Sequence, residues 1–227
     1  MLDLYLIRHA QAYTNQQNEH IGGRSDYSPL TPQGYIEATA LGNWFLKSNI
    51  IFDEIHSSTS VRTLMTATQI STITKFNIES IIKSPSLLEL DQGEWEGKLR
   101  SEVYTTEVLK EINKGTGDFT PPQGESQNCV AARMMNYITT NILKETGTTT
   151  TTNGPCTKAA IFTHGMAIKC FLQAVLKSDP GMTYKIVIDN TSITRVKYTS
   201  HGWHIMNING TTHLQGINRT ADLYAGP

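Results

Sequence analysis

Arg8 and His9 stand side by side where a short apolar segment ends. Residues 2–7 are mostly apolar and β-prone, which predicts a buried strand that opens into a polar loop. The guanidinium of an arginine can donate two parallel hydrogen bonds to phosphate oxygens. A neutral histidine supplies a nitrogen nucleophile or a proton carrier. Taken alone, the pair also fits a surface arginine beside a hydrogen-bonded loop histidine. Together, these two residues have the chemistry to hold a phosphoryl group and to attack it.

Three further places put polar side chains at predicted strand ends. Ser58 precedes Arg62 on the following helix, Glu89 follows the third predicted strand, and His164 follows another strand. Ligands of open α/β sheets bind at the edge where parallel strands end. Helices that begin after Ser58 and His164 would also aim backbone N–H groups at that edge. This set indicates phosphoryl transfer through a histidine nucleophile, with a carboxylic acid protonating the leaving oxygen.

Each of these residues also has a plain structural explanation. Arg62 fits an exposed helix residue, His164 a core histidine bonded to a carbonyl, and Glu89 a helix cap. A metal site built from the histidines and carboxylates is disfavoured, because two arginines would repel a divalent cation and no His-x-x-x-His pair occurs. We therefore expect no metal and no cofactor. The acidic residues after Glu89 are expected to form a solvated loop: Asp91, Glu94 and Glu96.

Predicted strands and helices alternate along the chain. Strands are expected at residues 2–7, 53–58, 79–84, 158–163, 193–199 and 203–208. Helices are expected from Thr31-Pro32 onward, and at residues 61–71, 99–113, 131–142 and 166–176. The first helix should bury an apolar stripe: Ile36, Ala40, Leu41, Trp44 and Phe45. This alternation predicts a single α/β domain over residues 1–227, a three-layer α/β/α sandwich around a mainly parallel sheet.

Composition and loops narrow the function classes. With 19 basic and 20 acidic side chains, the 227-residue chain lacks the charge of a nucleic-acid or membrane-surface protein. Three cysteines are too few for a disulfide framework, and neither a signal segment nor a membrane-spanning run is seen. We expect a cytoplasmic protein that binds a small-molecule phosphate ester and binds no nucleic acid or membrane. A homodimer is an assembly that the sequence leaves open. Residues 146–154 should form a mobile surface connection.

Several short motifs run in a fixed order along nearly the whole chain. They are Arg8-His9-Ala10-Gln11 with Asn15, Pro29-Leu30-Thr31-Pro32-Gln33-Gly34, Ser57-Ser58 through Arg62 to Ala67, Leu88-Glu89 through Gly97, Pro121 through Ser126, Thr163-His164-Gly165, and Asn209 followed by His213-Leu214. This set resembles the histidine phosphatase superfamily, which includes the cofactor-dependent phosphoglycerate mutases. The resemblance implies a phosphoglycerate mutase-like fold.

The same resemblance assigns expected roles to individual residues. His9 would be the phosphohistidine nucleophile and Glu89 the proton donor. The phosphoryl oxygens would be clamped by Arg8, Arg62 and His164. The remaining substrate contacts would come from Asn15, Gly22, Gly23 and Arg24. Ala10, Gln11 and Ala12 replace the Gly, Glu and Thr that are commonest in the family, which puts the substrate preference in doubt but not the phosphoryl chemistry.

Two features favour a phosphatase over a mutase. The mutases carry a tyrosine three residues after the acid and an added basic segment with an Arg-Arg pair. Here Gln92 holds the tyrosine position, and residues 101–120 contain only Lys110 and Lys114 as cations. We therefore expect a phosphatase that hydrolyses a phosphate monoester through a phosphohistidine. A cofactor-dependent phosphoglycerate mutase and a non-catalytic phospho-ligand-binding relative are the alternatives.

Overall fold

The computed structural model describes residues 1–143 and 157–217. Within them, a six-stranded sheet has the order β3-β2-β4-β1-β5-β6. Its strands are β1 (Leu2–Arg8), β2 (Glu54–Ser57), β3 (Ile82–Lys83), β4 (Thr157–Thr163), β5 (Ile193–Thr199) and β6 (Gly202–Gly210). Strands β1 to β4 pair in parallel, while β5 pairs antiparallel with both β1 and β6. The prediction of a mainly parallel sheet is confirmed.

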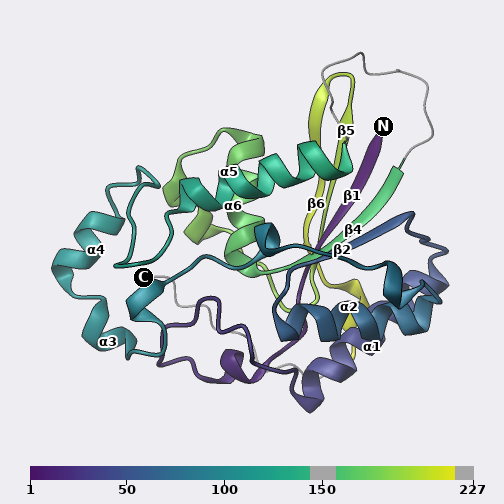
Figure 1. Cartoon of the computed structure of the whole chain (residues 1–227), viewed down its shortest axis with the longest axis horizontal. Helices are drawn as coiled ribbons and strands as arrows, with labels where there is room; N and C mark the ends of the chain where they lie inside the picture. Colours follow the sequence, from purple (N-terminus) through teal and green to yellow (C-terminus); the bar gives the residue numbers. More distant parts are fainter. Residues whose placement is uncertain (144–156, 218–227) are drawn as a thin grey trace.

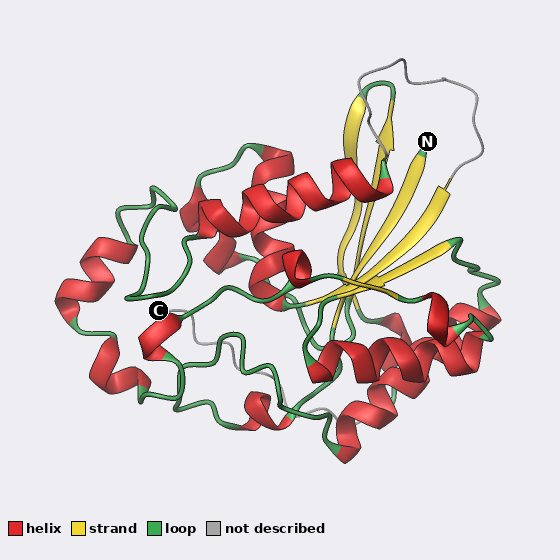
Figure 2. Cartoon of the chain, in the orientation of Figure 1, coloured by secondary structure: helices red, strands yellow, loops and turns green. Residues whose placement is uncertain are grey.

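Helices cover both faces of this sheet (Figure 1). Helices α1 (Pro32–Lys47) and α2 (Val61–Thr74) lie on one face, and α5 (Gln127–Tyr137) and α6 (Gly165–Leu176) on the other. Because strand side chains alternate, Tyr5 and Ile7 belong to the apolar cluster shared with α1 and α2. Leu4 and Leu6 belong to the cluster shared with α5 and α6. Figure 2 shows the same three layers by secondary structure, so the predicted α/β/α sandwich is confirmed.

Two predicted elements are shorter than the sequence indicated. The expected helix over residues 99–113 is divided into α3 (Arg100–Val103) and α4 (Thr106–Ile112), because the Thr105 side chain accepts the Val108 N–H at 3.3 Å and starts a new helix. The expected strand over residues 79–84 pairs only at Ile82–Lys83. Short 3-10 turns occupy Tyr13–Gln16, Ile78–Ser80, Pro85–Leu87, Gly93–Trp95, Pro180–Lys185 and Thr212–Leu214, and a π-helical turn occupies Ile138–Ile142.

Helix α1 buries a face slightly rotated from the predicted one. Leu41 and Phe45 are fully buried as expected, but Ile36 is 52% exposed. Gly34 lies on the buried face, and the position requires a glycine because a Cβ there would come within 2.1 Å of the Gln11 carbonyl oxygen. The carboxylate of Glu37 is also buried, where it accepts the Gln11 N–H at 2.9 Å. A specific polar contact with the loop after β1 therefore sets the rotation of α1.

The strands end level with one another. β1 ends at Arg8, opposite Thr163 of β4, and the ladder continues because the His9 N–H donates to the Thr163 carbonyl at 2.9 Å. Similarly, the Ser58 N–H donates to the Phe162 carbonyl at 2.9 Å. Three residues therefore follow their strands at the same edge of the sheet: His9, Ser58 and His164.

Two expectations from the sequence concern a surface connection at residues 146–154 and membrane-spanning segments. The segment at residues 146–154 lies outside the described residues, so its expected role as a surface connection is untested. In the described part of the chain, none of the helices is both long and apolar enough to cross a membrane.

Candidate active site

The edge of the sheet where the parallel strands end opens into a pocket of about 140 Å³. Its lining combines charged groups from the strand ends with residues of the loop after β1. Seven of the residues expected from the sequence line it: Arg8, His9, Asn15, Gly22, Gly23, Arg62 and Glu89. The topology therefore brings together a histidine, two arginines and a carboxylate that are distant in the sequence.

His9 is held in one neutral tautomer. Its ring is buried, and its Nδ1–H donates to the Ala10 carbonyl at 2.8 Å. The Nε–H of Arg62 donates to His9 Nε2 at 3.2 Å. Because an arginine can only donate, Nε2 must carry a lone pair. Burial, followed by the charges of Arg62 and Arg8, holds the pKa of His9 well below its usual value. His9 thus lines the pocket with an unprotonated nitrogen.

His164 lies behind this pair with the opposite tautomer. The Nη2 group of Arg62 donates to His164 Nδ1 at 3.0 Å, so the proton of His164 is on Nε2, which donates to Ser58 Oγ at 2.8 Å. The two histidine rings lie edge to face with centroids 5.2 Å apart. Burial, then Arg62, His9 and Arg8, lower the pKa of His164 well below its usual value. Arg62 therefore touches both histidines, and both are neutral at neutral pH.

We expect mild acid to destabilise this arrangement. A histidine in the unfolded chain has a pKa of about 6.5, whereas folding lowers the pKa of His9 and His164, so the unfolded state binds protons first as the pH falls. Between about pH 6.5 and about pH 5, the free energy of unfolding should drop by up to about 1.4 kcal/mol per pH unit for each histidine. Urea denaturation across this range should show a smaller drop for His9→Asn than for the wild type. An equal drop in both proteins would contradict the assignment.

Arg62 also fixes the loop that borders the pocket. Its Nη1 group donates to the carbonyls of Arg24 and Ser25 at 2.7 and 2.8 Å, and Nη2 donates to the Gly23 carbonyl at 3.2 Å. The side chain is only 3% exposed, so the alternative of an ordinary surface arginine is wrong. One guanidinium therefore joins the histidines to the loop at residues 23–25.

Arg24 does not reach the pocket lining. Its guanidinium pairs instead with Asp91 at 3.1 Å and with Glu125 at 3.6 Å. Glu96 accepts the Arg24 N–H at 2.7 Å, which anchors the backbone of the same loop. The expectation of a solvated acidic loop is therefore wrong for Asp91 and Glu96, whereas Glu94 is exposed.

Glu89 presents a carboxylate to the pocket from the segment that follows β3. Its Oε1 accepts the N–H groups of Leu90 and Ala167 at 2.9 and 3.0 Å, and its Oε2 accepts the Met166 N–H at 3.1 Å. Met166 and Ala167 belong to the first turn of α6. Glu89 therefore binds the N-terminus of a helix and lines the pocket at the same time, so the two sequence-based readings of this residue are compatible.

Sequence reasoning missed the outer wall of the pocket. Arg100, Tyr104 and His20 line it, together with Gln92, whose position was noted from the sequence. Residues 19–21 pair with residues 97–100, for example through the Arg100 N–H and the Glu19 carbonyl at 2.8 Å. The Arg100 guanidinium lies 5.0 Å from the centre of the Tyr104 ring. The sequence signal for this wall was Arg100 itself, a basic residue that follows the acidic loop and directly precedes residues 101–120.

The described residues contain no group of three or more His, Cys, Asp or Glu side chains arranged to hold a metal ion. Arg8 and Arg62 are the charges that act on His9, and Glu89 lines the same pocket. Arg8 is buried, and its Nη1 donates to the Ile188 carbonyl at 2.7 Å, which fixes the direction of its guanidinium. The pocket can thus bind a phosphoryl group through side chains and place a neutral imidazole nitrogen next to it.

Most of the sequence matches the model of a known protein family. The model described as the histidine phosphatase superfamily (branch 1) matches residues 4–211. The chain belongs to this superfamily. Superfamily members are phosphatases or mutases, so the chain is expected to be an enzyme, and the resemblance seen in the sequence motifs is confirmed.

Individual relatives extend the match over nearly the full length. A probable phosphoglycerate mutase GpmB of Proteus mirabilis is 30% identical over 96% of this chain and 97% of its own length. The corresponding protein of Serratia proteamaculans is 28% identical over 94% of this chain and 95% of its own length. A phosphoserine phosphatase variant from Entamoeba histolytica, solved with phosphoserine, is 25% identical, with a TM-score of 0.78 over 94% of this chain and 100% of that chain. These proteins share the superfamily fold and differ in their named activities.

Proposed function

We propose that this chain is a phosphatase that hydrolyses a phosphate monoester through a phosphohistidine at His9. The observation that carries the proposal is the unprotonated Nε2 of His9, which accepts from Arg62 in a pocket that Arg8 and Glu89 also line. A neutral imidazole beside two guanidinium groups is suited to attack a phosphorus atom whose oxygens those groups hold.

The first step transfers the phosphoryl group to the enzyme. Arg8 binds the phosphoryl oxygens, and the Nε–H of Arg62 moves from His9 Nε2 to one of these oxygens, which frees the lone pair of His9 Nε2 to form a bond to phosphorus. The bond between phosphorus and the leaving oxygen breaks, and the electron pair goes to that oxygen. Glu89, in its protonated form, donates a proton to the leaving oxygen, so that an alcohol departs. His164, bonded to Arg62, keeps this guanidinium in place.

The second step returns the enzyme to its starting state. The Glu89 carboxylate accepts a proton from water as the water oxygen bonds to phosphorus. The bond between phosphorus and His9 Nε2 breaks, and the nitrogen regains its lone pair. Inorganic phosphate leaves, and Glu89 is protonated again for the next cycle.

The outer wall of the pocket favours substrates with a second negative charge. Arg100 and His20 line the same pocket and are not among the residues that would hold the phosphoryl group. The Entamoeba histolytica enzyme has been solved with phosphoserine and, at 26% identity, with 3-phosphoglyceric acid, both of which carry a carboxylate. Small phosphorylated carboxylic acids are therefore the first substrates to test.

A phosphoglycerate mutase is the second candidate, because the relative from Proteus mirabilis carries that name. A mutase must return the phosphoryl group from the histidine to a retained product rather than to water. Gln92 occupies the position in the pocket lining where the mutases carry a tyrosine. The absence of that tyrosine supports hydrolysis over transfer.

We expect the purified protein to release inorganic phosphate from 3-phosphoglycerate or phosphoserine with no divalent ion added. The assay should follow inorganic phosphate and 2-phosphoglycerate together, in the presence of 2,3-bisphosphoglycerate as a phosphoryl donor. Phosphate should form without accumulation of 2-phosphoglycerate. Faster formation of 2-phosphoglycerate than of phosphate would establish the mutase instead. Failure to turn over any phosphate monoester in a broad panel would favour a binding protein.

A further inference from the structure

The segment that carries Glu89 lies outside the regular sheet. β3 ends at Lys83, so the carbonyls that follow have no neighbouring strand to pair with. Side chains bind three of them instead. Thr163 Oγ1 donates to the Leu87 carbonyl at 2.7 Å, and Arg133 donates to the carbonyls of Ser86 and Glu89 at 2.9 and 3.0 Å. The backbone position of Glu89 therefore depends on contacts from distant elements.

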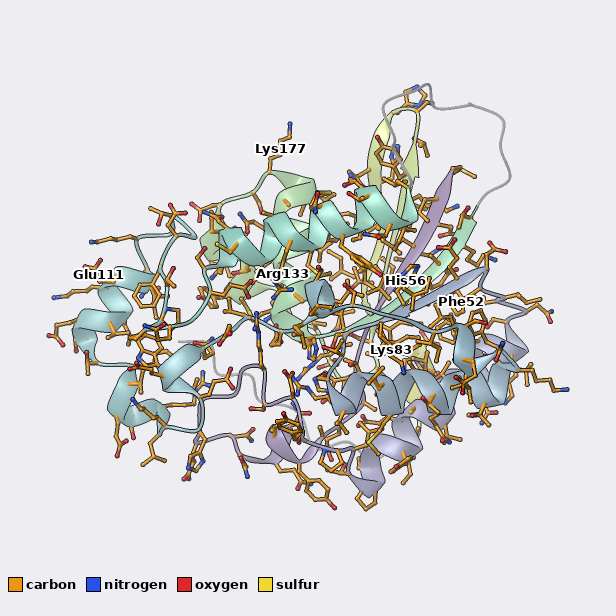
Figure 3. The ribbon with its side chains drawn as sticks, viewed as in Figure 1. Phe52, His56, Lys83, Glu111, Arg133 and Lys177 are labelled. Carbon is orange, nitrogen blue, oxygen red and sulfur yellow. The ribbon has the colours of Figure 1, made fainter. Side chains whose placement is uncertain are left out.

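Arg133 is the side chain that makes two of these contacts. It projects from the inner side of α5 (Figure 3). Its Nη1 donates to Ser86 and its Nη2 to Glu89, while Nε and Nη2 also form a bidentate pair with Glu125 at 2.8 and 2.9 Å. The side chains of Arg133 and Glu125 are each 17% exposed. All three guanidinium nitrogens are engaged, which fixes the plane of the group relative to Glu89.

Glu125 is itself anchored to the segment after Glu89. Its N–H donates to the Asp91 carbonyl at 2.9 Å, and its Oε2 lies 3.6 Å from the Arg24 guanidinium. Burial raises the pKa of Glu125, but the hydrogen bond and charge of Arg133, the charge of Arg24 and a backbone hydrogen bond together leave the pKa lowered. The carboxylate thus stays charged and keeps Arg133 in position. Together Arg133 and Glu125 join α5, the segment at residues 86–91 and the loop at residues 23–25.

We propose that Arg133 is a positioning residue for the general acid. This inference rests on the proposed phosphatase function of the same pocket. Glu89 is held at two points: its carboxylate by the first turn of α6 and its carbonyl by Arg133. With both points fixed, the carboxyl group has one location relative to His9. Loss of the Arg133 contacts frees the Glu89 backbone and removes none of the hydrogen bonds described above for Arg8 and Arg62.

The test compares two aryl phosphates that differ in one ring substituent. The leaving group of phenyl phosphate is the more basic and depends more on a proton from the acid, whereas that of 4-nitrophenyl phosphate needs little protonation. In Arg133→Lys and Arg133→Met, kcat for phenyl phosphate should fall on the order of 10²-fold, the effect expected of a misplaced catalytic group. In the same variants, kcat for 4-nitrophenyl phosphate should fall several-fold at most. Arg133→Lys keeps a positive charge beside Glu125 but lacks the two Nη groups that donate to the carbonyls of Ser86 and Glu89. This variant therefore tests the inference even if Arg133→Met does not fold.

Arg195→Met supplies the matched control. Arg195 on β5 forms a bidentate pair with Asp3 at 2.8 and 2.7 Å, so its loss removes the same kind of ion pair away from the pocket lining. This variant should treat both substrates like the wild type. A second control repeats Arg133→Lys in a Glu89→Gln background, where the selective loss on phenyl phosphate should vanish because the acid is already absent.

The outcomes separate this inference from the proposed function. Equal losses on both substrates in the Arg133 variants, or a selective loss that persists without Glu89, would show a merely structural role and overturn the inference. Wild-type protein that turns over neither substrate nor any other phosphate monoester would overturn the proposed function itself. A selective loss confined to the Arg133 variants and dependent on Glu89 would establish the positioning role.

Discussion

Replacement of His9 by alanine is expected to remove turnover of every phosphate monoester. The variant retains Arg8 and Arg62 and so still binds the phosphoryl group, but no unprotonated nitrogen remains to attack it. The rate should fall on the order of 10⁴-fold or more, as expected when an enzyme loses its nucleophile. Steady-state kinetics with an alkyl and an aryl phosphate would measure the loss.

His56→Asn is the matched control for this substitution. His56 is also a buried histidine, but it lies on β2 with its ring bonded to Tyr137 and Glu54 and does not line the pocket. The His56→Asn variant should therefore hydrolyse phosphate monoesters at the wild-type rate. Substantial activity in His9→Ala, with the protein folded, would reject His9 as the nucleophile and direct attention to another group in the pocket.

Replacement of Glu89 by glutamine is expected to have the second largest effect. A glutamine at this position keeps the shape of the side chain and loses the transferable proton. Turnover of an alkyl phosphate should fall by about 10²–10⁴-fold, the range typical of a general acid. The loss should be much smaller for 4-nitrophenyl phosphate, whose leaving group needs little protonation. Paired kinetic measurements on the two substrates test this directly.

An exposed acidic neighbour provides the comparison. Glu94 lies in the same loop with its side chain in solvent, so Glu94→Gln should behave like the wild type on both substrates. Equal losses on the alkyl phosphate and on 4-nitrophenyl phosphate in Glu89→Gln would show that its bonds to the first turn of α6 are its main contribution. The acid would then have to be sought among the other carboxylates near the pocket.

The sequence was sufficient to predict how the main catalytic candidates come together. His9, Ser58 and His164 each lie at the end of a predicted strand, and parallel strands that end level must bring such residues to one edge. Arg62 could be predicted as well, because it lies four residues after Ser58, in the first turn of the following helix. In these cases a local pattern, together with the geometry of a parallel sheet, determines the long-range contact.

Other parts of the site depend on contacts that no local pattern contains. The tautomers of His9 and His164 follow from a single arginine that donates to both rings. Arg133 contacts Ser86 and Glu89 across 47 and 44 residues of sequence, and nothing in its helix marks it as different from a surface arginine. Arg24 was expected at the substrate and is held instead by two carboxylates. Tertiary packing determines which partner each of these arginines binds, and the spacing of residues in the sequence does not contain that information.

Trapping of the covalent intermediate tests the central claim most directly. The protein would be mixed with phosphate-labelled 4-nitrophenyl phosphate, quenched in alkali during turnover and digested, and the labelled peptide would be sequenced. A phosphohistidine at His9 predicts label on the peptide that contains His9, stable in alkali, lost in acid and absent from His9→Ala. Label in acid-stable form on a serine or threonine, or on any peptide without His9, would contradict the account.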